Sequence, residues 1–373
     1  MELKTTSTGK EKNDGIEILR IVSMFFVLVL HTLLLGGMLS EVEGQEVIYN
    51  VSWLMESIAL GAVDIFAIIS GYVGYTEKPR KYRVSSFVML WLMVLTYSVG
   101  LALIENAIIP EAITVKDIQM SFFPVTSRWY WYFTCYTGLF VLMPVLDYAV
   151  RALPKKKLKM ILLGIILLFS VYNIWFGRFE LESGYSTIWL VLLYLIGAII
   201  KKCEIGVNLK ARTLIAVIVA GNLITWMWMI LIQPFDILCF SFTKETLVQY
   251  ISPTVLLPSI AYVILFSRIK LKKGGDIQNV IRFFSPAVFA AYIINTHPFL
   301  WFHFIPERLI HMRSEGLASV IFSVIFFSLL FLAAAVLIER LRMLLVKLLR
   351  IRQGIEWVEA NVRGWIQARS GSS

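Results

Sequence analysis

Long apolar runs separated by short polar segments make up most of the chain. Each run is about 18–25 residues long, which is the length that a helix needs to cross the hydrocarbon core of a bilayer. The pattern predicts an all-α fold, namely a polytopic membrane helical bundle of about ten transmembrane helices. The predicted spans are residues 16–38, 51–74, 84–107, 129–149, 160–177, 184–200, 213–232, 247–267, 283–304 and 317–339.

Lysine and arginine are distributed unevenly between the two sets of loops that alternate along the chain. The amino-terminal segment, the even-numbered loops and the carboxyl-terminal segment hold 29 of the 35, and the opposite set holds the other six. Cytoplasmic loops of membrane proteins carry an excess of these residues. We therefore expect both termini to be cytoplasmic, and an even number of spans agrees with this orientation.

The two ends of the chain differ from the apolar middle. The first apolar run has full spanning length and lacks a small-residue cleavage site, which favours a retained helix over a signal peptide. Residues 340–367 alternate apolar and basic positions at helical spacing, which predicts an amphipathic helix on the inner membrane surface. The predicted division is a cytoplasmic tail over residues 1–15, a transmembrane domain over 16–340 and a basic amphipathic cytoplasmic tail over 341–373.

Composition supports the membrane assignment and excludes other classes. Hydrophobic residues make up 58% of the chain, charged residues 16%, and the mean hydropathy is +0.75, which is too apolar for a soluble domain. The three cysteines show no C-x-x-C spacing, so neither a disulfide framework nor a metal site is expected. The net charge of +10 sits on the loops predicted to be cytoplasmic. It therefore favours membrane lipids and anionic cytosolic ligands as partners, and no nucleic acid.

The first apolar run, "GIEILRIVSMFFVLVLHTLLLGG", carries two polar residues, Arg20 and His31. Eleven residues are three helical turns to within about 20°, so both side chains lie on one face, roughly 16 Å apart along the axis. Arg20 can be explained as an interface residue whose charged group reaches the headgroups. A histidine in hydrocarbon needs a partner or a water-filled cavity and marks a functional site, and its pKa near neutral suits proton transfer.

The Arg-x10-His spacing resembles that of the membrane acyltransferase-3 family, the bacterial integral-membrane O-acyltransferases of surface glycans. Four further stretches resemble family motifs in the same order along the chain, and the resemblance covers essentially residues 15–340. The family more often has apolar residues where this chain has Asn295 and Thr296. The four stretches are "VDIFAIISGYVGY" (63–75), "RKYR" (80–83), "WYWYFTCYTGLFVLMPVL" (129–146) and "FFSPAVFAAYIINTHPF" (283–299).

The resemblance implies a multi-pass enzyme of the cell membrane, an O-acetyltransferase or a related O-acyltransferase. Its donor would be cytosolic acyl-CoA, in the first instance acetyl-CoA, and its acceptor a hydroxyl of a cell-surface or lipid-linked polysaccharide. His31 would act as the general base, with a covalent acyl relay through His31 left open. Asp64 would orient or charge-balance His31, although it is also explained as a structural partner of a buried group.

The donor site is expected near the cytoplasmic membrane face. Arg20, Arg80 and Arg83 would hold the phosphates of acyl-CoA, because arginine binds phosphate through paired hydrogen bonds. Arg80 and Arg83 are equally explained as ordinary cytoplasmic loop charge. Ser70 is assigned to the donor site with them, and the alternative is that Ser70 and Gly71 let two helices pack closely.

The acceptor is expected at the outer side. Trp129 and Trp131 would stack on a sugar ring, although an aromatic belt at the membrane interface also explains them. His297 would bind the acceptor or support His31, and the alternative is that it caps the helix end before Pro298. Tyr292 would donate a hydrogen bond in the same place, and Glu56 is explained as either structural or facing the acceptor.

Two other functions fit a membrane bundle. A transporter or flippase for a lipid-linked glycan, without acyl transfer, would also use polar residues within the membrane. The absence of internal repeats and of paired broken helices in the sequence disfavours it. A membrane sensor or scaffold is disfavoured by the short loops.

Overall fold

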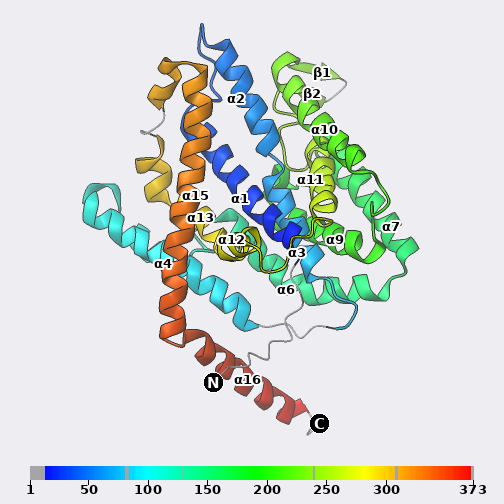
Figure 1. Cartoon of the computed structure of the whole chain (residues 1–373), viewed down its shortest axis with the longest axis vertical. Helices are drawn as coiled ribbons and strands as arrows, with labels where there is room; N and C mark the ends of the chain where they lie inside the picture. The colour runs from blue at the N-terminus through cyan, green and yellow to red at the C-terminus, as the bar shows by residue number, and fades with distance from the viewer. Residues whose placement is uncertain (1–12, 80–83, 128, 238–239, 307–309, 371–373) are drawn as a thin grey trace.

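The protein is a bundle of helices with one small β-hairpin (Figure 1). The computed structural model describes residues 13–79, 84–127, 129–237, 240–306 and 310–370. The hairpin joins β1 (Phe235–Ile237) to β2 (Phe240–Phe242) in antiparallel register. The expected helical fold is therefore confirmed, with the correction that this short sheet interrupts it between two helices.

The helices follow one another along the chain with few long connections. The α-helices are α1 (Asp14–Leu35), α2 (Glu46–Ala59), α3 (Ala62–Gly74), α4 (Val84–Ile108), α5 (Val115–Ser121), α6 (Trp131–Ala152), α7 (Lys155–Gly164), α8 (Asn173–Phe176), α9 (Thr187–Cys203), α10 (Ala211–Leu231), α11 (Pro253–Phe266), α12 (Asp276–Phe284), α13 (Phe289–Asn295), α15 (Leu317–Leu348) and α16 (Ile351–Ser370). Shorter 3₁₀ and π-helical turns are η1 (Pro110–Ala112), η2 (Ile165–Tyr172), η3 (Glu182–Gly184), η4 (Phe299–Phe304) and η5 (Ile310–Glu315).

Within the described residues, seven helical segments are long and apolar enough to cross a membrane. An eighth is added if α12 and α13, which meet at a bend of 42°, count as one span. Two other predicted spans form shorter helices, α9 with 17 residues and α11 with 14. The protein is thus a multi-pass membrane protein, and the count of ten crossings stays a prediction. The seven segments are Asp14–Leu35, Glu46–Gly74, Val84–Ile108, Trp131–Ala152, Lys155–Phe176, Ala211–Leu231 and Leu317–Leu348.

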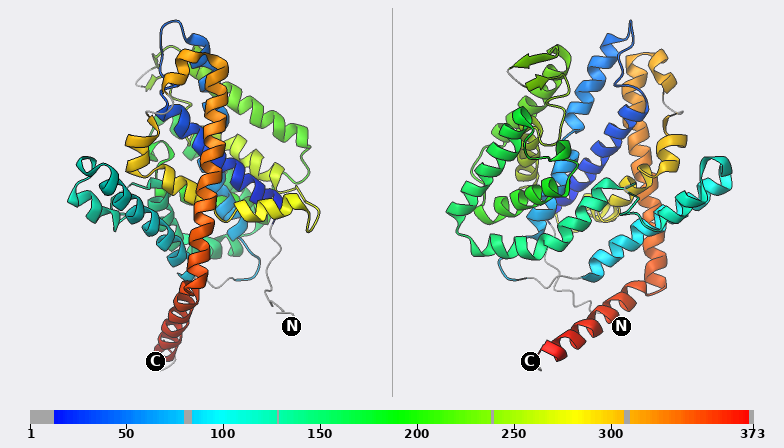
Figure 2. Two further views of the ribbon diagram at one scale, coloured as in Figure 1. Left: turned by 60° about the vertical axis from the view of Figure 1, so that its left-hand side comes forward. Right: turned by 180° about the vertical axis from the view of Figure 1, so that it is seen from behind.

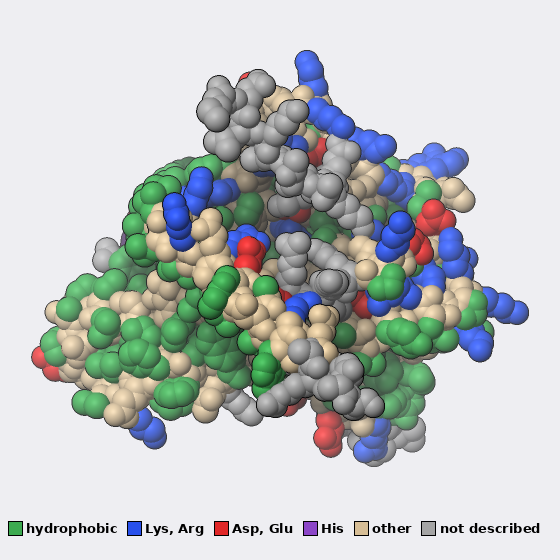
Figure 3. All heavy atoms as spheres, turned by 90° about the horizontal axis from the view of Figure 1, so that it is seen from below, with side chains coloured by type: hydrophobic (Ala, Val, Ile, Leu, Met, Phe, Trp, Pro, Cys, Tyr) green, Lys and Arg blue, Asp and Glu red, His purple; other side chains and the backbone are tan. Residues whose placement is uncertain are grey.

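The basic loops meet at one end of the molecule. The Lys202 ammonium donates a 2.8 Å hydrogen bond to the carbonyl of Val150, and the Arg268 guanidinium donates one of 2.8 Å to the carbonyl of Leu209. Seen from this end, lysine and arginine side chains gather on the surface (Figure 3). We call it the basic end. It comprises residues 150–159, 201–212 and 268–282 together with α16.

Three loops of the other set, those that contain Glu41, Lys244 and Arg313, meet at the end that carries the β-hairpin, which we call the hairpin end (Figure 1). Lys244 forms an ion pair with Glu41 there. The Arg313 guanidinium donates 2.9 Å hydrogen bonds to the Gln45 side chain and to the carbonyl of Ser40. These three loops therefore lie together, as the charge pattern predicts. Which end faces the cytoplasm stays a prediction.

Helix α1 runs through the middle of the bundle, with α15 along one side of it (Figures 1 and 2). It begins at the side chain of Asn13, which accepts a hydrogen bond from the amide of Ile16 at 3.1 Å. It ends at Leu35, and two residues later Gly37 has a φ of 67°, a left-handed conformation that glycine adopts without steric cost. Both ends of α1 are thus fixed by the local sequence.

One of the tightest helix crossings in the core joins α3 to α9. A Cβ atom on Gly71 would lie 1.9 Å from the carbonyl oxygen of Tyr194, and one on Gly197 would lie 2.0 Å from the carbonyl oxygen of Ile68. Only glycine allows two helix backbones to approach this closely, and such contacts give membrane helices much of their packing energy. The crossing explains why the Ser-Gly pair at 70–71 stands in this part of the sequence.

Replacing either glycine of this crossing should push α3 and α9 apart. Gly71→Ala and Gly197→Ala should each cost about 2 kcal/mol, because overpacking a tight contact forces the backbones to shift. Thermal unfolding of the detergent-solubilised protein measures this loss. Gly100→Ala is the matched control, since nothing lies within 4 Å of a Cβ at that position on α4. Equal midpoints for all three variants would contradict the assignment.

Candidate functional site

One face of α1 lines a series of three adjoining cavities. Arg20, Met24, Val27 and His31 contribute to them, at spacings of four, three and four residues. Such spacings keep side chains on one side of a helix. The two polar residues of the first span therefore share a face, as their separation predicts.

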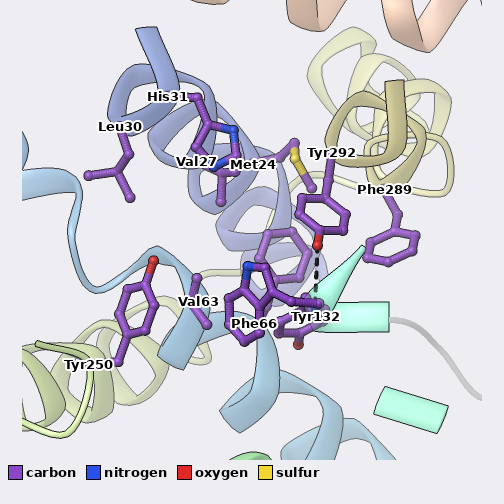
Figure 4. A pocket seen from close by; sticks show the side chains of 11 residues that line it. Met24, Val27, Leu30, His31, Val63, Phe66, Tyr132, Tyr250, Phe289 and Tyr292 are labelled. Carbon is purple, nitrogen blue, oxygen red and sulfur yellow. Dashed lines mark hydrogen bonds between the residues drawn. The ribbon is translucent and has the colours of Figure 1, made fainter. Parts of the chain in front are cut away.

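The central cavity is narrow, with a volume of about 30 Å³. This is room for about two water molecules. His31 and Met24 enter it from α1, and Tyr292 and Phe289 enter it from α13 (Figure 4). Its lining is otherwise apolar and aromatic. The full lining consists of Met24, Val27, Leu30, His31, Val63, Phe66, Trp131, Tyr132, Tyr250, Phe289 and Tyr292.

The wide cavity opens toward the hairpin end and has a volume of about 550 Å³. It shares Leu30, His31, Trp131 and Tyr250 with the central cavity, so the two adjoin at His31. Aromatic side chains dominate its wall. These are Trp53, Trp129, Trp131, Tyr185, Tyr250, Trp301 and Phe302.

The arginine cavity lies on the other side of the central cavity, toward the basic end, and has a volume of about 240 Å³. It shares Phe66, Tyr132 and Phe289 with the central cavity. Its lining includes the polar side chains of Arg20, Ser70, Ser285, Tyr132 and Tyr136. The three cavities thus form a path from Arg20 past His31 to the hairpin end, and its narrowest part is the central cavity.

His31 is held by a hydrogen bond that crosses the bundle. Its Nδ1 atom lies 2.5 Å from Oδ1 of Asn295, and its ring meets the Trp301 indole edge-on at a centroid distance of 4.9 Å. An amide oxygen only accepts, so the proton of the neutral ring is assigned to Nδ1 and the lone pair to Nε2. Nε2 has no hydrogen-bond partner among the described residues, and it is therefore the nitrogen available to take a proton.

Asp64 does not reach His31. Its carboxyl group is fully buried and accepts a 3.0 Å hydrogen bond from the indole of Trp189 on α9. It lines none of the three cavities. The orienting role expected of Asp64 falls instead to Asn295, which is one of the two polar residues that depart from the family pattern. Asn295 is a polar side chain in an apolar helix, and this marks it in the sequence as a candidate site residue. The sequence does not show that its partner is His31, 264 positions away.

Arg20 faces the arginine cavity rather than the lipid. It forms a 3.0 Å ion pair with Glu17, and 27% of its side chain remains exposed. Glu17 also accepts a hydrogen bond from the Ser285 hydroxyl. Ser70 lines the same cavity, with its hydroxyl donating to the carbonyl of Phe66 at 3.0 Å. Arg80 and Arg83 lie outside the described residues.

The two tryptophans assigned to the acceptor line the wide cavity. Trp131 also lines the central cavity, and its ring packs against that of Tyr185, a residue of the wide cavity, at a centroid distance of 4.5 Å. Glu56 faces the same wide cavity, and its Oε2 atom is buried with no hydrogen-bond partner in the described chain. This oxygen can accept a hydrogen bond from a hydroxyl group in a wall that is mostly aromatic and aliphatic.

The side chains of Tyr292 and His297 form hydrogen bonds with the backbone. The Tyr292 hydroxyl lines the central cavity and accepts the backbone N–H of Tyr132 at 3.1 Å (Figure 4), one of the first amides of α6 that lack a helical partner. His297 is fully buried. Its Nε2 lies 3.2 Å from the carbonyl of Ser98, and its Nδ1 accepts the amide of Phe299 at 3.1 Å. Phe299 is the first residue of η4, so His297 caps the start of η4 after Pro298 rather than the helix end before Pro298.

Fold and site together define a membrane-embedded protein that presents a histidine between two cavities opening toward opposite ends. A family model described as an acyltransferase domain matches residues 13–340, nearly the whole chain, and the chain belongs to the membrane acyltransferase-3 family. Membership implies acyltransferase activity. No curated protein and no solved structure matches the chain.

Proposed function

We propose that the protein transfers an acyl group, in the first instance acetyl, from acyl-CoA at the basic end to a hydroxyl of a cell-surface or lipid-linked saccharide in the wide cavity. One observation carries the proposal. His31, with an unpartnered Nε2 among the described residues, borders both the wide and the central cavity. A base at that junction can meet a donor from one side and an acceptor from the other.

The donor enters from the basic end in this proposal. Arg20 attracts its phosphates, and Arg80 and Arg83 would add to that attraction. The thin acyl-bearing arm then follows the α1 face toward His31, a distance of roughly 16 Å by helix rise. The central cavity must widen to admit it. Met24, an unbranched and flexible side chain at its wall, can move aside at low cost.

The transfer step needs one base and one orienting group. Nε2 of His31 removes the proton of the acceptor hydroxyl as its oxygen attacks the thioester carbonyl. The tetrahedral intermediate collapses, the C–S bond breaks, and the thiolate of CoA takes the proton from Nε2. Asn295 keeps Nδ1 protonated and the ring in place throughout. In a covalent relay the same Nε2 would carry the acyl group first.

The wide cavity suits a saccharide. Its volume of about 550 Å³ falls within the range of small-molecule sites, about 300–1,000 Å³. Trp129, Trp131 and Trp301 offer flat apolar faces for sugar rings. The free oxygen of Glu56 can accept a hydrogen bond from a sugar hydroxyl and so turn the neighbouring hydroxyl toward His31.

His31→Ala should abolish acylation while the protein still inserts and folds, because Nε2 is the base in the transfer step. The measurement is incorporation of labelled acetyl groups from acetyl-CoA into surface glycan, together with the acetyl mass on that glycan. His311→Ala, an exposed position on η5, is the control and should retain activity. Full acetylation by the His31 variant would sink the proposal. Glycan that is exported by the wild-type protein without any added acetyl mass would point to the transporter instead.

Glu56→Gln should raise the KM for the acceptor by about tenfold and leave the KM for acyl-CoA unchanged. A hydrogen bond contributes about 0.5–1.5 kcal/mol, and the substitution replaces one acceptor oxygen of the Glu56 side chain by an amide nitrogen. Initial-rate measurements with each substrate varied in turn give the two constants. Glu43→Gln, in the exposed loop before α2, is the charge-matched control. An unchanged acceptor KM would remove Glu56 from the acceptor site.

A further inference from the structure

A fourth hollow, which we call the basic cleft, lies where α15 gives way to α16. Its volume is about 490 Å³, and helix α4 forms its opposite wall. Its lining divides into an apolar side and a charged side. The apolar side consists of Met89, Leu90, Met93, Pro286 and Phe289, and the charged side, from α15 and α16, of Glu339, Arg342, Lys347, Arg350 and Arg352 together with Met343, Val346 and Gln353.

At the bottom of the cleft, the charge of Arg342 is neutralised by Glu339. Arg342 holds both oxygens of Glu339 through two 2.7 Å hydrogen bonds. The Tyr97 hydroxyl on α4 donates to the same carboxylate at 2.8 Å. This buried group ties α15 to α4 and fixes the width of the cleft, and it leaves no spare charge for a ligand.

The rim of the cleft carries the spare charge. Lys347 and Arg350 form no ion pair with any residue that the structure describes, whereas Arg352 pairs with Glu356 at 3.0 Å. Arg350 sits at the break between α15 and α16 with a φ of 54°, a conformation that is uncommon for a residue with a side chain. The turn at Arg350 thus leads into α16, and the two cations without an ion pair, Lys347 and Arg350, lie at this turn.

Helix α16 is fixed to the start of α4. The Glu359 carboxylate accepts the backbone N–H groups of Val84 and Ser85, each at 3.0 Å, and pairs with Arg363 at 2.6 Å. Hydrogen bonding to Ser85 lowers the pKa of Glu359 to about 2, so the group is ionised at neutral pH. The carboxylate caps the first amides of α4, next to residues 80–83. The cleft is therefore a fixed feature of the basic end.

The cleft continues into the donor path. It shares Leu90, Pro286 and Phe289 with the arginine cavity, and that cavity adjoins the central one. A ligand with an anionic head at the rim and a thin apolar arm could therefore extend past Arg20 toward His31. The apolar wall on α4 suits the stem of such a ligand, and the two rim cations suit its phosphates.

We propose that the basic cleft binds the phosphate-bearing nucleotide end of the acyl-CoA donor, with Lys347 and Arg350 as its phosphate contacts. This inference rests on the proposed function. Both residues lie beyond the matched region, residues 13–340, so the segment after the family domain completes the donor site of this chain. An anionic lipid headgroup presents the same phosphate chemistry, and the experiment separates the two sources.

The test measures equilibrium binding of CoA and of 3′-dephospho-CoA to the purified full chain in nanodiscs of zwitterionic lipid. Lys347→Gln/Arg350→Gln should weaken CoA binding by about tenfold, since a charge-assisted contact to phosphate is lost. It should weaken 3′-dephospho-CoA binding less, so the preference of the wild-type protein for CoA should shrink. Lys156→Gln/Lys157→Gln removes the same charge from exposed positions on α7 at the same end and should leave both affinities unchanged.

Three outcomes would overturn the inference. Equal CoA affinity of the rim variant and the wild-type protein would remove the cleft from the donor site while the proposed function stands. A wild-type protein that binds no CoA would contradict the donor of the proposed function itself. A rim variant that binds CoA normally but no longer retains anionic lipid, measured in nanodiscs of mixed composition, would assign the cleft to lipid headgroups.

Discussion

A polar group in the apolar interior of a membrane protein must face a partner or a cavity, and the arrangement of this bundle follows from that constraint. Helix α1 carries two such groups. Arg20 is balanced by Glu17, and His31 is fixed by Asn295 from α13. Each pairing engages only one of the nitrogen atoms of the Arg20 or His31 side chain. The remaining guanidinium and imidazole atoms face cavities, which is why those cavities line one side of α1.

The same constraint explains how the site is divided. The wide cavity and the arginine cavity are separated by the narrow central cavity, so the two ends of the bundle do not share an open channel. A narrow passage limits leakage of water and ions, yet a thin acyl chain can pass if side chains at its wall rotate. The close crossing of Gly71 and Gly197 holds α3, which supplies Val63 and Phe66, firmly against α9.

Much of this arrangement was predictable from one-dimensional patterns. The lengths of the apolar runs predicted the helices, and the alternation of basic loops predicted that these loops lie at one end. The eleven-residue spacing predicted that Arg20 and His31 share a face of α1. Three features depend on contacts that the sequence alone does not specify. Asn295, rather than Asp64, orients His31, because a hydrogen bond across the bundle depends on how α13 bends. His297 uses both ring nitrogens on the backbone. The strands Phe235–Ile237 and Phe240–Phe242 are too short to show the alternation of apolar and polar residues that predicts a strand.

The central claim is that the acyl group passes through the central cavity along the α1 face, and closing that cavity tests it most directly. Val27→Phe places a ring in a space of about 30 Å³ while Arg20, His31 and Asn295 remain. Val219→Phe, exposed on α10, is the control for the added ring, and Val27→Ala keeps the passage open. The measurement is single-turnover transfer of labelled acetyl from CoA to glycan, with CoA binding determined on the same samples. The account predicts that Val27→Phe binds CoA normally and loses transfer by at least about tenfold, as expected when reacting groups cannot meet. Transfer at the wild-type rate through the filled cavity would contradict it.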